Sequence, residues 1–204
     1  ARDDEGNFII SLRGSSTVYY IDRVSKAILW RLGGKKSDFK MGKGYDAAVS
    51  YLPTAMEVLK LPLTQADFWF QHHVRIYSLP SNPHEKLVTL FSNGANQFEQ
   101  TADTARGMVL RLNLAEMTAE LEREYLPSFK HACSSEGSMQ ILDNGNVVIG
   151  WGIGALEYPL SGATYTNADG STVPQTGFSE YSEDGKLLHE VQFGQIDGRA
   201  EHDH

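Results

Sequence analysis

The stretch SMQILDNGNVVIGW, residues 138–151, contains the strongest fold signal in this sequence. Two apolar runs, 138–142 and 146–151, flank the dipeptide Asn144-Gly145. The central residues of a tight hairpin turn must accept positive φ angles, which asparagine and glycine do most readily. The pattern therefore predicts two antiparallel strands joined by a short turn.

Short strands of this kind recur along most of the chain. Asp184-Gly185 and Asn93-Gly94 also follow apolar runs, so each predicts a further hairpin turn. Many short strands at this spacing indicate an all-β sandwich, barrel or propeller. The other expected strands span residues 8–13, 17–22, 27–32, 68–79, 86–92, 107–114, 177–182 and 186–193.

Two segments depart from the strand pattern. Residues 45–61 are rich in Ala, Met, Leu and Glu, which favours a helix, and we expect it within an insert spanning residues 40–66. Residues 114–125 also have helical composition. The sequence AELEREYL nevertheless alternates apolar and charged side chains as an outer strand would, so both alternatives stay open.

A weak repeat groups the strands into units. Residues 68–126 and 134–194 each hold roughly four expected strands, and residues 6–34 hold three. Four-stranded units repeated at this interval are typical of propeller blades. We therefore expect residues 1–204 to form one partial β-propeller domain, with a partial blade, two full blades, and a tail or the start of another blade at 195–204.

The bulk composition narrows the classes of partner. A net charge of −8, with no basic cluster longer than Lys35-Lys36, argues against a general nucleic-acid binder. No apolar run approaches the roughly 18 residues that span a membrane, so no membrane partner is expected either. A propeller typically needs at least four blades to close. We expect the remaining blades on the same or another chain.

No motif for a metal or cofactor stands out. The single cysteine, Cys133, excludes an internal disulfide. The sequence has no glycine-rich phosphate loop and no nucleophile elbow. EHDH at residues 201–204 could hold a metal, but a chain end is usually mobile. We therefore predict no metal and no cofactor.

Two adjacent histidines interrupt the apolar strand FWFQHHVRIY, residues 68–77. Strand alternation predicts that His72 shares a face with Val74, and that His73 shares the other face with Arg75. An imidazole is neutral and available as a nucleophile near pH 7. The alternative is that each histidine is a buried, hydrogen-bonded structural residue.

Other polar residues could contact an anion. Arg13 ends the expected strand FIISLR, and its planar fork of donors fits a tetrahedral oxyanion; the alternative is a surface arginine at a strand end. Arg75 is a second candidate. Asn93, Asn96 and Gln140 could donate amide hydrogen bonds, although we interpret Asn93 as the turn residue of its Asn-Gly pair.

Several stretches together resemble arylsulfotransferase-type β-propellers, especially the fungal branch. The resemblance covers most of the chain except residues 40–66 and the last ten, and its specificity comes from the order of the pieces. The stretches are GNFIISLRGSSTVYYIDRVSKAILWRLGG (6–34), FQHHVRIY (70–77), LVTLFSNGANQ (87–97), SSEGSMQILDNGNVVIGWG (134–152) and FSEYSEDGKLL (178–188).

The resemblance implies a six-bladed propeller with its site in the central channel. It also implies ping-pong transfer of a sulfuryl group from an aryl sulfate to a phenol through a sulfated histidine, independently of a nucleotide sulfate donor. By position, His72 resembles the nucleophile and Arg13 the arginine that holds the sulfuryl oxygens. The expected substrate-binding residues are His73, Arg75, Asn96 and Gln140.

The resemblance carries further expectations. A family pair of a histidine and an asparagine, two residues apart, is expected just before residue 1, and the protein is expected to be secreted. The alternative function is a non-catalytic propeller that binds a ligand or a protein, because one fold hosts many unrelated functions.

Overall fold

The described part of the protein is all-β, as the sequence predicts. It holds the strands β1 to β14 and one short turn of 3-10 helix at Arg13–Ser15. Within the part of the chain that is described, no helix is long and apolar enough to cross a membrane. The computed structural model describes residues 1–42, 66–94, 104–128, 133–154 and 176–193.

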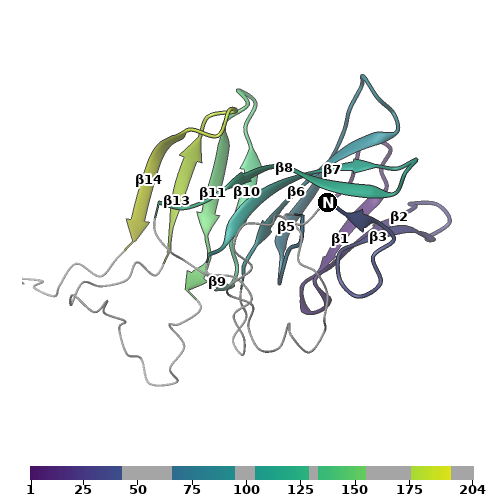
Figure 1. Ribbon diagram of the computed structural model, residues 1–204, viewed down its shortest axis with the longest axis horizontal. Coiled ribbons are helices and arrows are strands. Elements are labelled where there is room, and N and C mark those ends of the chain that lie inside the picture. Colours follow the sequence, from purple (N-terminus) through teal and green to yellow (C-terminus); the bar gives the residue numbers. More distant parts are fainter. Residues whose placement is uncertain (43–65, 95–103, 129–132, 155–175, 194–204) are drawn as a thin grey trace, which may run out of the picture.

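Three sheets lie side by side along the molecule, with β1–β3 at one end and β14 at the other (Figure 1). Their strand orders are β1-β2-β3, β4-β8-β7-β6-β5 and β10-β11-β13-β14, and we call them the first, second and third sheet. β9 and β12 form a separate pair. The bounds are β1 Phe8–Leu12, β2 Thr17–Ile21, β3 Ile28–Leu32, β4 Lys40–Met41, β5 His72–Ser78, β6 Glu85–Ser92, β7 Arg106–Asn113, β8 Thr118–Tyr125, β9 Cys133–Ser135, β10 Ser138–Ile141, β11 Val147–Trp151, β12 Ile153–Gly154, β13 Thr176–Tyr181 and β14 Leu187–Phe193.

Two of the three expected hairpin turns are confirmed. Gly145 (φ +83°) lies between β10 and β11, and Gly185 (φ +90°) lies between β13 and β14. The turn expected at Asn93-Gly94 is wrong. Ser92, the last residue of β6, pairs with Arg106, so residues 93–105 separate the two strands.

Of the two segments that depart from the strand pattern in the sequence, residues 114–125 contain a strand, and most of the insert at 40–66 lies outside the described residues. Residues 114–125 contain the strand β8, whose backbone pairs with β7 in an antiparallel register that shifts once, opposite Val109 and Leu110. The expected insert begins with the short strand β4, which pairs with β8 in parallel. Residues 43–65, which include the expected helix, lie outside the described residues, and so does the tail at 195–204.

The second sheet is covered on both faces. Val88 and Leu90 of β6 pack in one core cluster with Trp30 of the first sheet. Phe91 points the other way and packs in a second cluster with Ile149 of the third sheet. Alternate residues of one strand thus serve two cores, as the period of two requires. The described sheets do not close into a ring, so the propeller stays a prediction.

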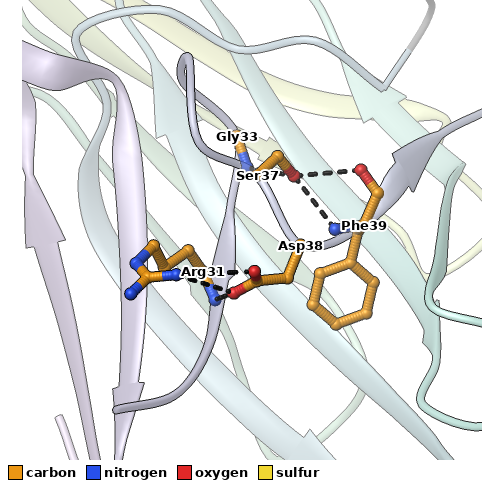
Figure 2. A network of polar contacts seen from close by, with 5 residues as sticks. All are labelled: Arg31, Gly33, Ser37, Asp38 and Phe39. Atoms are coloured by element: carbon orange, nitrogen blue, oxygen red, sulfur yellow. Dashed lines mark hydrogen bonds and ion pairs between the residues drawn. The ribbon is translucent and has the colours of Figure 1, made fainter.

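Figure 2 shows the turn that leaves the first sheet. Ser37 Oγ accepts hydrogen bonds from the N–H groups of Gly33 and Phe39, both at 3.2 Å, and donates to Phe39 O at 3.0 Å. Asp38 accepts from the Arg31 backbone N–H at 2.7 Å and pairs with its guanidinium at 3.4 Å. These bonds fix the chain so that Phe39 enters the first core cluster.

The second and third sheets pack so closely at Gly107 that an added side chain should clash with Ile149, and a smaller residue at 149 should relieve the clash. A Cβ added at Gly107 would lie 2.5 Å from Ile149 Cδ1. Gly107→Ala should therefore lower the free energy of unfolding by about 1–3 kcal/mol through overpacking, and Ile149→Val alone by about 0.5–1.5 kcal/mol. Valine lacks the methyl group that clashes. Urea unfolding should therefore show that the double variant loses less unfolding free energy than the sum of the two single losses.

The control is Gly14→Ala, because a Cβ there meets nothing within 4 Å. Its stability should stay within roughly 0.5 kcal/mol of the parent. Strictly additive losses for Gly107→Ala and Ile149→Val would contradict the observed contact of the two sheets.

Candidate functional site

The candidate site lies where the start of β5, the end of β6 and the segment 133–137 meet. His72 is the first residue of β5 and is half-buried. It pairs across the sheet with Phe91, two residues before Asn93. A Cβ at Gly137 would lie 2.2 Å from the Phe91 ring, which shows how closely the segment packs on β6.

A β-bulge changes the faces expected for the two histidines. His72 pairs with Phe91, but Arg75 pairs with Thr89, so β5 holds one residue more than β6 over this interval. His73 takes up the extra residue with a φ of +53°. Because cross-strand partners share a face, His72 and Arg75 lie on one face. The expectation that His72 shares a face with Val74 is therefore wrong.

A short chain of hydrogen bonds holds His72. Its Nδ1 lies 2.7 Å from Asn93 Oδ1. Asn93 Nδ2 in turn donates to the backbone oxygen of Glu136 at 3.0 Å. Asn93 is fully buried, so both halves of its amide are satisfied inside the protein. No partner of His72 Nε2 occurs among the described residues.

The neighbouring His73 has both ring nitrogens engaged. Its Nδ1 lies 2.7 Å from Met139 O in β10, and Arg75 Nη2 lies 3.0 Å from its Nε2. Burial is the main cause that lowers the pKa of His73 below its ordinary value of 6.5; the bond to Met139 opposes this shift, and the Arg75 charge adds to it. The ring is thus a neutral link between the second and third sheets.

Arg13 reaches across from the first sheet. Its Nη2 donates to the backbone oxygen of Ser134, and its guanidinium lies over the Phe70 ring, 5.6 Å from the centroid. Its Nε is buried and has no hydrogen-bond partner among the described residues. A buried donor without a partner is costly, so an acceptor placed beside this atom would remove that cost.

Arg13 and His72 converge on one short segment. Arg13 binds Ser134, and Asn93, which holds His72, binds Glu136 two residues further on. The backbone N–H of Cys133 also donates to Asn93 O at 2.8 Å. The structure therefore brings the two expected catalytic residues to the same junction.

The backbone at this junction is unusually strained. Six non-glycine residues with positive φ occur in the described ranges. Four of them lie here, namely Ser16, Phe70, His73 and Glu136. The Phe70 N–H donates to Ser16 Oγ at 3.1 Å, which holds two of these residues together. Such conformations cost about 1–3 kcal/mol each and tend to cluster at functional sites.

Gln71 joins the first sheet to the second just before His72. It is 1% exposed, and its Nε2 donates to Ser11 Oγ at 2.9 Å and to Thr17 O at 3.1 Å. Its own backbone oxygen accepts from Ser11 Oγ at 3.1 Å. These bonds join the residue that precedes β5 to β1 and β2, so they fix the position from which His72 extends.

The remaining predicted site residues do not all gather here. Gln140 is exposed on β10, next to Met139, which faces the second sheet. Alternation therefore places Gln140 on the far face of the third sheet. Arg75 binds His73 and its own strand at Val74 O, 2.9 Å away. Asn96 lies outside the described residues.

Sequence reasoning missed the part that Asn93 plays. The Asn-Gly dipeptide suggested a turn, but a two-residue turn requires the returning strand to begin directly after Gly94. The next expected strand began only at residue 107. The long interval between Gly94 and the next expected strand indicates that Asn93 is not the residue of a two-residue turn. No pattern in the sequence pointed to Ser134 or Glu136, since both act through their backbone oxygens.

The fold and the site define a β-rich protein in which Arg13 binds the segment 133–137 directly and His72, from the neighbouring sheet, is tied to it through Asn93. Residues 59–170 match the Arylsulfotransferase (ASST) family. This match spans more than half of the 204 residues, so the chain belongs to that family. A comparison with curated proteins gave no significant match.

The lowered pKa of His73 predicts a pH-dependent stability. Below about pH 6.5 the unfolded chain binds a proton at His73 that the folded protein resists, so the free energy of unfolding falls as the pH falls through this window. His73→Asn removes the titration, keeps an N–H for Met139 O and suits positive φ. Urea unfolding should show a smaller loss of stability between about pH 7 and pH 5 in this variant.

The matched control is His84→Asn, because His84 is exposed. Its loss of stability over the same interval should equal that of the parent. An unchanged pH dependence in His73→Asn would show that the site does not resist protonation at His73.

Proposed function

We propose that the protein is an aryl sulfate sulfotransferase-like enzyme in which His72 carries the sulfuryl group between two phenolic oxygens. One observation carries this proposal. His72 is held through Nδ1 by Asn93 while its Nε2 has no partner among the described residues, and Arg13 is bound to the same segment. Membership of the Arylsulfotransferase (ASST) family supports small aryl compounds as the substrates.

In the first half of the reaction, the Nε2 lone pair of His72 attacks the sulfur of an aryl sulfate. An N–S bond forms, the bond from sulfur to the aryl oxygen breaks, and the phenolate leaves with the bonding electron pair. A nucleophilic histidine thus divides one difficult displacement into two easier ones. No electrons are gained or lost by the protein, so the step needs no redox partner.

In the second half, the oxygen of an acceptor phenol attacks the same sulfur. The N–S bond breaks, its electron pair returns to Nε2, and the acceptor's proton passes to the solvent or to the departed phenolate. The free enzyme is regenerated with the ring in its original state. Donor and acceptor use one site in turn, which is the origin of ping-pong kinetics.

Arg13 supplies charge stabilisation in both halves. A guanidinium stays charged at any physiological pH and offers several donors to the oxygens of a tetrahedral anion. The buried Nε of Arg13 has no partner in the described part of the protein, and a sulfuryl oxygen would provide one. His73 is not included among the substrate contacts, because its ring nitrogens already bind Met139 and Arg75.

We further propose that the three sheets are blades of a larger propeller. Both outer faces of the row carry exposed apolar side chains. Ile10 is 42% exposed on the first sheet, and Phe178 and Phe193 are 37% and 55% exposed on the third. Further sheets packed on these faces would cover them. Secretion of the protein stays a prediction.

The blade arrangement is tested by a crystal structure of the complete gene product. We expect additional four-stranded sheets against the Ile10 face and the Phe178 face, with β5 near the central axis. A sandwich in which the present sheets cover each other's outer faces would contradict the blade arrangement.

The transfer mechanism predicts unequal losses for two variants. With a chromogenic aryl sulfate and a phenol acceptor, His72→Ala should abolish transfer, because the covalent intermediate cannot form. Arg13→Ala should slow transfer by roughly 10²–10³, the scale of losing one preorganised donor to a charged transition state. Protein trapped with donor alone should gain one sulfuryl group, located on His72 by peptide mapping.

His73→Asn is the control, since it alters the adjacent histidine but leaves His72 and Asn93 in place. It should keep most of the transfer activity. Undiminished transfer by folded His72→Ala would end the role of His72 as the sulfuryl carrier, and a parent protein that transfers nothing would leave a ligand- or protein-binding scaffold as the better account.

A further inference from the structure

Resting on the proposed function, we propose that Asn93 is the positioning residue that fixes His72 in its Nδ1–H tautomer and so presents the Nε2 lone pair to the sulfuryl group. A neutral imidazole carries its proton on one of two nitrogens, and only the unprotonated nitrogen can attack. The hydrogen bond to the other nitrogen sets which one is free. The surroundings of Asn93 determine that choice here.

The backbone of Asn93 is pinned on both sides. Its N–H donates to Trp69 O at 3.0 Å, and its carbonyl oxygen accepts from the Cys133 N–H at 2.8 Å. The residue is 0% exposed. These bonds tie the end of β6 to the chain entering β5 and to β9. The side chain of Asn93 therefore starts from a fixed point.

The orientation of the Asn93 amide follows from its second partner. The Glu136 backbone oxygen can only accept a hydrogen bond, so the amide nitrogen must face it, at 3.0 Å. The amide oxygen then faces His72 Nδ1, at 2.7 Å. Because this oxygen also only accepts, Nδ1 must carry the proton. Nε2 of the neutral ring consequently keeps its lone pair.

His72 differs from the neighbouring His73 in that the lone pair of its Nε2 has no partner among the described residues. His73 Nδ1 also faces a carbonyl oxygen, that of Met139, so His73 has the same tautomer. Its Nε2 lone pair, however, accepts from Arg75 at 3.0 Å. Both rings are therefore fixed in one tautomer, but only His72 has an unoccupied Nε2 within the described structure.

Asparagine suits this task because it accepts without adding charge. A carboxylate at the same place would also accept from Nδ1, but it would favour the doubly protonated ring, which has no lone pair. It would also face the Glu136 carbonyl oxygen with a second acceptor. Asn93 thus fixes the tautomer without placing a charge beside the ring.

The tautomer is tested directly by long-range ¹H–¹⁵N NMR of protein labelled at histidine. The signals of His72 are assigned from their absence in His72→Ala. In the parent protein, Nδ1 should be of the protonated type and Nε2 of the unprotonated type. A protonated Nε2 in the parent would overturn the proposal, whatever the transfer activity.

Two variants separate positioning from mere structural support. Asn93→Ala should let His72 populate both tautomers and should lower kcat by roughly 10–100-fold, the usual cost of losing a group that orients a functional histidine, with little change in KM for the donor. Asn93→Asp retains an acceptor for Nδ1, so Nδ1 should stay of the protonated type, while the added negative charge should favour a proton on Nε2 as well and lower transfer. Asn113→Ala is the control, because Asn113 ends β7 and pairs with Glu85, at the end of β6 opposite to Asn93; it should change neither measurement.

The outcomes also distinguish this inference from the proposed function. Folded Asn93→Ala with His72 still wholly in the Nδ1–H form would overturn the role of Asn93 while leaving His72 as the nucleophile. If the parent has the predicted signature and His72→Ala nevertheless transfers normally, the proposed nucleophilic role of His72 fails and the tautomer assignment stands. If Asn93→Ala does not fold, the parent spectrum and Asn93→Asp still decide, and an unprotonated Nδ1 in the latter contradicts the proposal.

Discussion

The extra residue in β5, taken up at His73 with a φ of +53°, sets the geometry on which the rest of the site depends. In a regular strand, His72 and His73 would point to opposite faces, one toward each core. The bulge instead turns His72 and Arg75 to the face of Phe91 and Thr89. It places His73 against β10 and His72 against the end of β6. Two identical side chains thereby receive different partners.

Backbone atoms supply much of the support around these side chains. Arg13 binds the oxygen of Ser134, Asn93 binds that of Glu136, and His73 binds that of Met139. Since a backbone oxygen can only accept, each of these bonds fixes the orientation of the donor side chain without an added charge. The segment 134–139 is therefore the common support of residues from the first and second sheets. Its placement depends on the close packing of Gly137 against Phe91.

The sequence predicted the all-β class and most strands because alternation and turn chemistry are local properties. Asn144-Gly145 and Asp184-Gly185 each lie directly between the strands that they join, so their turns could be identified. The bulge could not, because a period of two assumes that no residue is added. His72 and Arg13 were predicted through a family resemblance, and their convergence on one segment needed the long-range pairing of sheets. The prediction for Asn93 is wrong because an Asn-Gly dipeptide can form a hairpin turn or, as here, place a buried asparagine where segments of the chain meet.

The proposed chemistry requires that His72 keeps a ring nitrogen without a hydrogen-bond partner, whereas both ring nitrogens of His73 are engaged. Carbethoxylation with diethyl pyrocarbonate measures this directly, because the reagent acylates an unprotonated imidazole nitrogen that has no hydrogen-bond partner. Fragmentation of the peptide that holds both histidines would locate the label. The account predicts that His72 is modified in the folded protein and that His73 is modified only after unfolding. Preferential labelling of His73, with His72 protected, would contradict it.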